Sequence, residues 1–287
     1  MIKNNNLNYR LEVQGKDNKV YIWDSRKVND SVSCLKVEYN IKKTYTNETN
    51  ISTITIYNLY ESTRQAIKKT KLEADIRYLN FAIGYDNQLY SIFTGSVKEC
   101  SSERNGNNII TTIQGWDGGE AITRAETNIT IDNTTDIYGT LFNDLKKYNI
   151  TKGYISPKAQ YKVAGTRGIV LNGKTWQLIK KYQNELDIFI NNQQLYIYAK
   201  GEYRSVAYKI NAETGLLNTP RDFGTGYIEV ETIAEPTIDL KTIVDLKSTN
   251  DPTYNGTYQV ISIEQSGSIC KIGDSQNWKS TFKLQKI

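Results

Sequence analysis

The side chains that most often carry out catalysis are scarce in this sequence. The 287-residue chain contains no histidine, so neither a Ser–His nor a Cys–His nucleophile pair can form. Asp117 and Glu120 are a candidate carboxylate pair. Solvated acids around a glycine-bearing turn explain them more simply, and nothing else resembles a glycosidase site. We therefore expect no enzyme and no catalytic residue, with carboxylate- or lysine-based chemistry as the alternative.

Motifs for phosphate and metal binding are also missing. The segment Gly165-Thr-Arg-Gly168 lacks the glycine spacing and the Lys-Ser/Thr of a P-loop, and no Gly-x-Gly-x-x-Gly occurs. Cys34, Cys100 and Cys270 are odd in number, far apart and in no Cys-x-x-Cys pair. Their pattern argues against a disulfide framework and against a zinc site. We expect reduced, buried or half-buried thiols, no metal and no cofactor.

Charge and hydropathy narrow the classes of partner. The 36 basic and 31 acidic residues give a net charge of +5, spread along the chain without a block of like charges. Sequence-specific nucleic-acid binding is therefore not expected. A β-barrel that binds single-stranded nucleic acid through its tyrosines is the physical alternative. The N-terminus lacks a signal-peptide core and no apolar run reaches the ~20 residues of a membrane span, so we expect no membrane insertion.

The stretch 52–98 has the clearest pattern of elements. In residues 52–57, Ile54 and Ile56 alternate with polar side chains, the period of a strand with one buried face. A short helix is predicted over 61–69, with Ser62 as its N-terminal cap and lysines at its end. Strands are predicted at 79–85 and 89–97, joined by a turn at Asp86-Asn87.

Further elements are predicted on both sides of this stretch. Before residue 118 we expect strands at 7–14, 19–23, 32–39 and 109–116, with a hairpin tip at 101–108. From residue 127 we expect a strand, two helices and a hairpin at 127–131, 136–147, 172–186 and 186–198. One helix face carries Ile137, Leu141, Phe142 and Leu145, and the other carries Trp176, Leu178, Ile179, Tyr182 and Leu186. Later strands are expected at 227–233, 242–247, 256–264 and 278–284.

These elements predict a mainly β (α+β) fold. We expect two antiparallel β-barrel domains with a small α+β domain inserted between them. The predicted boundaries are 1–125 for the first barrel, 126–205 for the inserted domain and 206–287 for the second barrel.

Three groups of residues stand in a fixed order along the chain. The first is Asn58-Leu59, Gly84-Tyr85 and Phe93-Thr-Gly95; the second is Trp116-Asp117-Gly118; the third is Thr214-Gly215-Leu216 followed by Pro220. In this order they resemble the baseplate or tail hub proteins of contractile-tailed phages and phage-tail-like particles such as bacteriocins and contractile injection systems. The resemblance covers nearly the whole chain. Ala234-Glu235-Pro236 departs from the family's Leu-Asn-Pro.

The resemblance implies a structural role without covalent chemistry. It implies a homotrimeric ring that joins a six-fold tail tube to a three-fold central spike, with strands 52–57 and 227–233 in the ring contacts. Implied partners are other copies of the chain, the central spike protein and the tail tube or tube-initiator protein; tape measure and baseplate wedge proteins are further candidates. The implied location is a baseplate assembled after synthesis in a bacterial cytoplasm.

Overall fold

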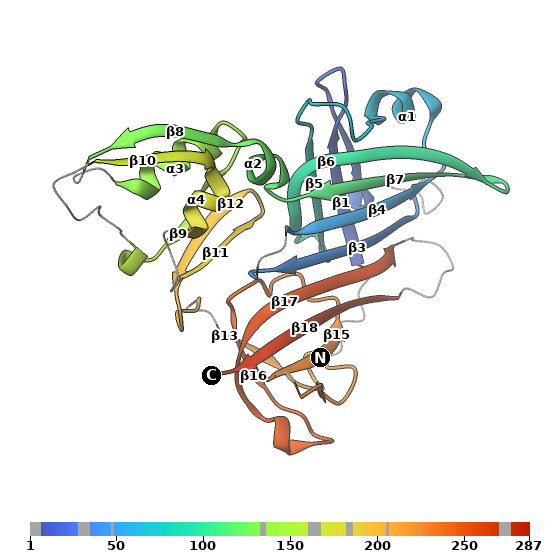
Figure 1. Cartoon of the computed structure of the whole chain (residues 1–287). Coiled ribbons are helices and arrows are strands. Elements are labelled where there is room, and N and C mark those ends of the chain that lie inside the picture. The colour runs from blue at the N-terminus through green and yellow to red at the C-terminus, as the bar shows by residue number, and fades with distance from the viewer. Residues whose placement is uncertain are drawn as a thin grey trace. The chain divides into compact units, whose positions relative to one another are not determined.

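The computed structural model describes residues 7–27, 35–46, 49–132, 136–159, 168–181, 186–204, 207–224, 226–269 and 277–287 (Figure 1). The chain folds as two compact units. Unit 1 comprises residues 1–44, 50–116 and 203–287, and unit 2 comprises residues 45–49 and 117–202. The boundaries expected from the sequence, after residues 125 and 205, stay a prediction beside this division.

Unit 1 consists almost wholly of strands. Its first part holds β1 (Leu7–Gln14), β2 (Val20–Asp24), β3 (Val37–Thr44), β4 (Ile51–Tyr57), β5 (Tyr78–Tyr85), β6 (Tyr90–Asn105) and β7 (Asn108–Trp116), with helix α1 (Glu61–Ile67) between β4 and β5. Its second part holds β13 (Ala207–Ile210), β14 (Arg221–Asp222), β15 (Tyr227–Ile233), β16 (Ile243–Leu246), β17 (Gly256–Ile269) and β18 (Trp278–Lys286). The short 3₁₀ helices are η1 (Ser25–Lys27) and η4 (Pro252–Tyr254).

These strands form one 13-stranded sheet. Its main path runs β14-β15-β18-β17-β3-β4-β7-β6-β5-β1-β2, and β16 joins β17 on one side and β13 on the other. The two parts of unit 1 meet in the antiparallel ladder between β17 and β3, which runs from Ser262↔Thr44 to Ile269↔Val37. The path is open from β14 to β2 among the described strands. The fold is thus mainly β, as predicted, and its division into two closed barrels stays a prediction.

The core of unit 1 follows from strand alternation. Leu7, Tyr9, Leu11 and Val13 on β1 are buried while the residues between them are half-buried. Successive strand side chains point to opposite faces, so this period of two puts one face into the core. Side chains from β3, β4 and β5 complete the cluster, among them Val37, Tyr39, Ile41, Ile54, Ile56 and Phe81.

Unit 2 combines helices with small sheets. It holds α2 (Gly119–Arg124), β8 (Glu126–Ile131), α3 (Ile137–Lys146), β9 (Thr151–Ile155), η3 (Pro157–Ala159), β10 (Ile169–Lys174), α4 (Thr175–Lys181), β11 (Leu186–Asn191) and β12 (Gln194–Ala199). β10 pairs with β8, and β12 lies between β11 and β9. The predicted face of α3 is confirmed, because Ile137, Leu141, Phe142 and Leu145 are all buried. Asp136 caps this helix by accepting from the backbone amide of Tyr138 at 3.0 Å.

Several predicted element bounds are wrong. Helix α1 starts at Glu61 with Tyr60 as N-cap and no side-chain cap, so Ser62 lies inside the first turn. Residues 101–105, predicted as part of a hairpin tip, continue β6. The helix expected to open at Asn172 begins at Thr175, because residues up to Lys174 pair with β8. Helix α2 and strands β9 and β13 were not predicted.

Some predicted features lie outside the described residues. They are Cys34, Cys270, Tyr182, the first residues of the strand expected at 32–39, most of the loop expected at 267–277 and most of the Gly165–Gly168 segment. Among the described residues, no helix is both long enough and apolar enough to span a membrane.

Candidate assembly surfaces

Asn58 and Leu59 end strand β4 and fasten it to its neighbour. Asn58 has a positive φ of 58°, the left-handed conformation that asparagine tolerates better than most residues. Its backbone amide donates to the carbonyl of Ile109 at 2.7 Å, and its side-chain oxygen accepts from the Ile109 amide at 2.9 Å. Leu59 is 5% exposed and packs into the core. The pair therefore stops the strand and turns the chain towards α1.

Gly84, Tyr85, Phe93 and Gly95 lie on the hairpin of β5 and β6. A Cβ atom at Gly84 would collide with the backbone carbonyl of Gln88, and one at Gly95 would collide with the carbonyl of Trp116. Phe93 is fully buried. The hydroxyl of Tyr85 donates to the carbonyl of Ala234 at 2.9 Å, and burial raises the pKa of this phenol. Gly84 and Gly95 therefore allow two backbone segments to approach closely, and Phe93 packs in the core.

Trp116 is the last residue of the first part of unit 1, and Asp117 and Gly118 are the next residues of the chain, in unit 2. Trp116 ends β7, and the ammonium group of Lys98 lies 5.3 Å from its ring centroid. Within unit 2, Asp117 is 1% exposed and accepts from the backbone amides of Asn192 at 2.6 Å and Gln193 at 2.7 Å. Gly118 has φ 68°, and a Cβ there would lie 2.7 Å from Cδ1 of Ile190.

Thr214, Gly215, Leu216 and Pro220 lead the chain onto strand β15. The Thr214 backbone amide donates to Oδ1 of Asn211 at 2.9 Å. The carbonyl of Gly215 accepts from the amide of Ile233 at 2.9 Å, and Gly215 has φ 102°. Leu216 forms an isolated bridge with Thr232. Pro220 is buried just before β14. The motif thus holds residues 215–222 along the edge of β15 that does not pair with β18.

The carboxylates considered for chemistry are buried and held in structural contacts, so the expectation that they are solvated is wrong. Asp117 binds backbone amides of the β11–β12 turn. Glu120 is 4% exposed and forms an ion pair with Arg124 at 2.8 Å. No group of three or more Cys, Asp or Glu side chains that could hold a metal ion occurs in the described part of the chain. The alternative of carboxylate chemistry gains no geometric support from this arrangement.

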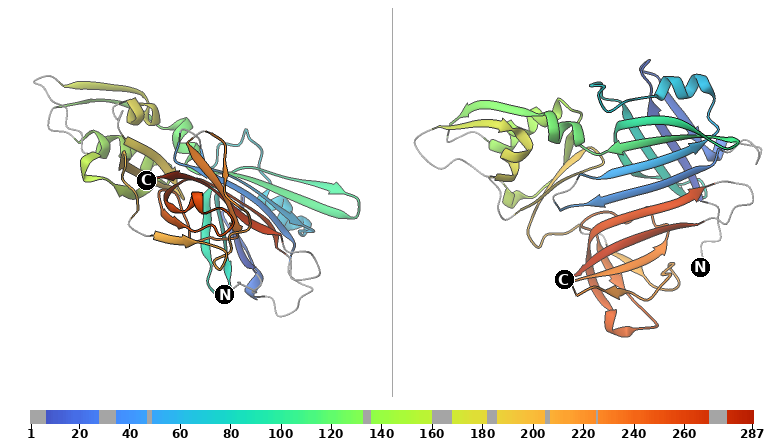
Figure 2. Two further views of the ribbon diagram at one scale, coloured as in Figure 1. Left: turned by 90° about the horizontal axis from the view of Figure 1, so that it is seen from below. Right: turned by 45° about the vertical axis from the view of Figure 1, so that its right-hand side comes forward.

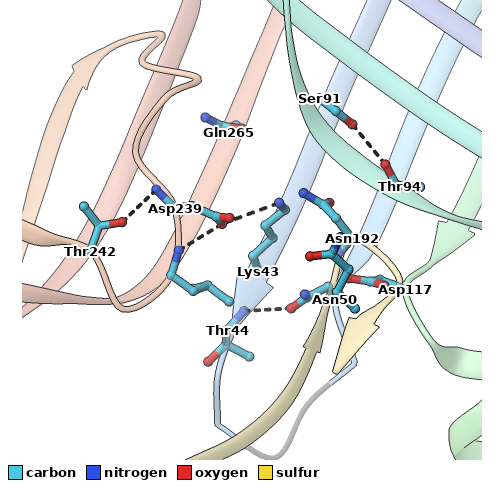
Figure 3. Close-up of polar contacts among 12 residues, drawn as sticks. Lys43, Thr44, Asn50, Ser91, Thr94, Asp117, Asn192, Asp239, Thr242 and Gln265 are labelled. Carbon is cyan, nitrogen blue, oxygen red and sulfur yellow. Dashed lines mark hydrogen bonds and ion pairs between the residues drawn. The ribbon is translucent and has the colours of Figure 1, made fainter. Parts of the chain in front are cut away.

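A buried cation on β3 was missed by the sequence reasoning. Lys43 has a side chain only 4% exposed, and its ammonium lies 3.7 Å from Oδ1 of Asp239 (Figure 3). Oδ2 of the same carboxylate accepts from Arg204 at 3.2 Å. Lys43 and Asp239 line a pocket of about 470 Å³ together with Tyr90, Arg204 and Tyr208. A sequence signal existed, because Lys43 continues the inward positions Val37, Tyr39 and Ile41.

Large apolar side chains gather on the surface beside strands β14 and β15. Leu217 is 49% exposed, Phe223 is 60% exposed and Tyr227 is 38% exposed. Phe223 and Tyr227 line a pocket of about 270 Å³ with Ile228, Glu229 and Lys283. Grouped apolar exposure next to a sheet edge is typical of a surface that another protein covers.

Comparison with known proteins gives a consistent picture. The family model described as baseplate hub gp41 matches residues 19–266. No curated protein sequence matches the chain. Solved structures share the fold, and three of them are compared with this chain by identity, coverage and TM-score. They are the prophage MuSo2 43 kDa tail protein from Shewanella oneidensis (8% identity, TM-score 0.63, 96% of each chain covered), a tail protein from Neisseria meningitidis MC58 (8%, 0.61, 97% of this chain and 96% of that one) and the E. coli c3393 protein (7%, 0.60, 91% and 76%). The last is described as a component of the type VI secretion system similar to T4 bacteriophage tail proteins gp27 and gp5.

Proposed function

This chain belongs to the baseplate hub gp41 family, and we propose that it is a structural hub subunit that assembles into a homotrimeric ring. The ring joins a six-fold tail tube on one face to a three-fold central spike on the other. In this proposal the two parts of unit 1 act as two barrel domains side by side. Three copies then present six similar domains to the tube.

The observation that carries the proposal is the β17·β3 ladder. It joins the two parts of unit 1 by backbone hydrogen bonds over the residues from Ser262↔Thr44 to Ile269↔Val37. Side-chain ties reinforce it, because Lys42 pairs with Glu264 at 3.2 Å and Asn40 donates to Glu264 at 2.9 Å. A wall built by such ladders transmits load along a tube, since its strands are connected through their backbones.

The mechanism in this proposal is mechanical. The subunit adapts one symmetry to another and passes force between tube and spike, and it makes or breaks no covalent bond. Its partners are other copies of itself, the spike and the tube or its initiator, with tape measure and wedge proteins as further contacts. It acts in the baseplate of a virion or of an extracellular phage-tail-like particle.

Strands β4 and β15 take part in this ring through their side chains. β4 is paired with β3 on one edge and β7 on the other, so its backbone has no edge left to offer. The outward side chains of β4 are Ile51, Thr53, Thr55 and Tyr57. Ile51 is 47% exposed, and we assign this face to the ring contacts.

Light scattering behind size exclusion tests the proposal. The chain is measured across salt concentrations, alone and with the spike protein encoded in the same gene cluster. We expect a trimer, or a monomer that the spike converts into a 3:3 complex. A chain that stays monomeric at every salt concentration, with and without the spike protein, contradicts the hub role. Binding to single-stranded oligonucleotides with a steep salt dependence would then favour the nucleic-acid alternative.

A further inference from the structure

Unit 1 contains the same arrangement of strands twice. In the first part, β4 pairs with β3 and β7, β6 pairs with β7, and β5 pairs with β6. In the second part, β15 pairs with β14 and β18, β17 pairs with β18, and β16 pairs with β17. Strands β3 to β7 therefore correspond one by one, in the same chain order, to strands β14 to β18.

The correspondence holds at the level of single residues. β4 faces β7 from Ile51↔Trp116 to Tyr57↔Ile110, and β15 faces β18 from Tyr227↔Gln285 to Ile233↔Lys279. The irregularity between β6 and β7 falls between Val97 and Glu99, and that between β17 and β18 falls between Val260 and Ser262. Counting from these ladders, Val97 corresponds to Val260. Both β-bulges thus lie at the same place in the repeat.

Burial repeats as well. The pattern along β4 alternates with buried residues at Ser52, Ile54 and Ile56, and β15 has them at the matching Ile228, Val230 and Thr232. Because register and burial both agree, the two parts are copies of one structural unit. A feature seen in one part can therefore be sought in the other.

The repeat differs at one edge. In the second part, the outer edge of β17 is paired with β3 along Ser262 to Ile269. The matching edge of the first part is β6 from Glu99 onwards, where Cys100 forms an isolated bridge with Lys69. Among the described strands, residues 101–105 then have a ladder partner only in β7. Figure 2 shows this hairpin of β6 and β7 continuing beyond the neighbouring strands.

The missing partner of that edge can be identified from the same repeat. β3 corresponds to β14, since each flanks the strand that starts at Ile51 or Tyr227. β14 is the end of the sheet path, so its outer edge carries no strand among those described. Six strands separate β14 from β6 along this path (β15, β18, β17, β3, β4 and β7). Within the described part of one chain these two edges are not paired with each other.

We propose that the β6 edge of one copy pairs with the β14 segment of a second copy and repeats the β17·β3 junction between chains. This inference rests on the self-assembly proposed above and names its contact. Transferring the register of the β17·β3 ladder places Ser101 opposite Phe223, Ser102 opposite Asp222 and Glu103 opposite Arg221. The contact is heterologous, the type that generates closed rings when the rotation allows it.

The charges at these positions are complementary. Glu103, Arg104, Arg221 and Asp222 are all exposed. Glu103 meets Arg221 directly, and Arg104 lies diagonal to Asp222, within reach of a long side chain. Because Cys100 exchanges backbone hydrogen bonds on the outer edge, alternation leaves Glu103 at a position not hydrogen-bonded across this edge. Side chains approach most closely at such positions. The exposed Phe223 directly follows β14, opposite Ser101 in this register, and would be covered by the joint.

Charge reversal tests the contact. Each of E103R and R221E should raise the protein concentration needed for half-maximal assembly by about tenfold, since like charges then oppose each other at every joint. The E103R/R221E double variant should return close to wild type, because the pair is restored with its signs exchanged. Glu213→Arg, at an exposed position outside both segments, is the matched control and should leave assembly unchanged. If the double variant needs as high a protein concentration for assembly as the single variants, the proposed pairing is wrong.

Cysteine cross-linking tests the register independently. In a C34S/C270S background, Glu103→Cys combined with Arg221→Cys should give disulfide-linked dimers and trimers on oxidation. Arg104→Cys with Arg221→Cys puts the two thiols on opposite faces and should not cross-link. Absence of cross-links in the first pair, in wild-type-like assemblies, overturns this contact while the hub role stands. A wild-type chain that stays monomeric with and without the spike overturns the hub role and this contact together.

Discussion

The carboxylate of Asp117 accepts a hydrogen bond from the backbone amide of Asn192 at 2.6 Å, and its other oxygen accepts from Gln193 at 2.7 Å. Asn192 and Gln193 form the β11–β12 turn and both have positive φ, at 52° and 59°. Neither is glycine, so the turn is held in a conformation that these residues adopt at a cost. The aspartate that follows β7 thus stabilises a turn 75 residues later in the sequence.

Replacing Asp117 by alanine should destabilise unit 2. Two backbone amides of the half-buried β11–β12 turn would lose a charged acceptor, which costs about 2–4 kcal/mol of unfolding free energy. Asp245→Ala, at an exposed position on β16, should change it by less than about 0.5 kcal/mol. Denaturant unfolding measures both, and hydrogen exchange at the β11–β12 turn should rise only in the first variant. Equal effects of the two substitutions would contradict this role for Asp117.

Gly118 and Gly106 offer a matched test of close packing. Both have positive φ, at 68° and 60°, but a Cβ at Gly118 would lie 2.7 Å from Ile190 Cδ1, while nothing lies within 4 Å of one at Gly106. Gly106→Ala should cost about 1 kcal/mol from backbone strain alone. Gly118→Ala should cost at least about 1 kcal/mol more, because Ile190 must shift. Thermal unfolding of the two variants compares them, and similar losses would argue against the packing of Gly118 on Ile190.

The ion pair of Lys43 and Asp239 should appear as a coupling energy. Asp239→Asn leaves the buried ammonium of Lys43 with a weaker partner and should cost about 1–3 kcal/mol. In a Lys43→Met background the same change should cost clearly less. Lys42 is the control, because its side chain is 56% exposed and pairs with Glu264. A double-mutant cycle with Lys42→Met should show no coupling to Asp239, and coupling of equal size in both cycles would contradict a specific pair.

Glu231 should make stability depend on pH in the acid range. Its hydrogen bond from Lys279 at 2.9 Å lowers the pKa of the carboxyl, and Asn218 also donates to it. A lowered pKa in the folded state means that stability is present above the unfolded value of about 4.3 and is lost as pH falls through the folded value. Glu231→Gln should therefore reduce Tm at pH 7 and lose its effect at the most acidic pH reached.

Thermal scans from pH 7 to 3 measure this dependence. Glu213→Gln, in an exposed turn, serves as the control and should track wild type at every pH. A Glu231→Gln deficit that stays constant down to the lowest pH would show that the lost stability is not electrostatic.

Cys100 should be inert to thiol reagents in the native protein. It is 1% exposed, and burial raises the pKa of its thiol to about 12. The thiolate is the reactive form, so little of it exists at neutral pH. In a C34S/C270S variant, labelling by Ellman's reagent should follow the unfolding transition in denaturant. Rapid labelling without denaturant would indicate that strand β6 opens locally.

Local sequence patterns were sufficient to predict many of the strands and helices. Alternating apolar and polar residues predicted β1, β4 and β15 to within a residue, and helical spacing predicted the buried face of α3. Both signals come from one face being buried, which a sequence records directly. The absence of histidine is enough on its own to exclude histidine-dependent catalysis. The order of short motifs indicated the hub family, to which the chain belongs.

The local sequence did not predict the end of strand β6 or the roles of the motif residues. Residues 101–105 of β6 are all polar and exposed, because a backbone ladder to β7 needs no apolar period. The motif residues were recognisable, but their tasks were not: Asp117 acts on a turn far along the chain, and Gly118 fits against Ile190. Such roles depend on which segments meet.

The amino-acid sequence by itself determined many of the strands and helices, the buried faces of β1, β4, β15 and α3, and the absence of histidine-dependent chemistry. Only the tertiary structure decided that β17 pairs with β3, that Lys43 meets Asp239, and that β3 to β7 are repeated as β14 to β18. The physical reason is that backbone hydrogen bonds are the same for every residue type. Partner choice between strands distant in the sequence is therefore fixed by the packing of the whole sheet.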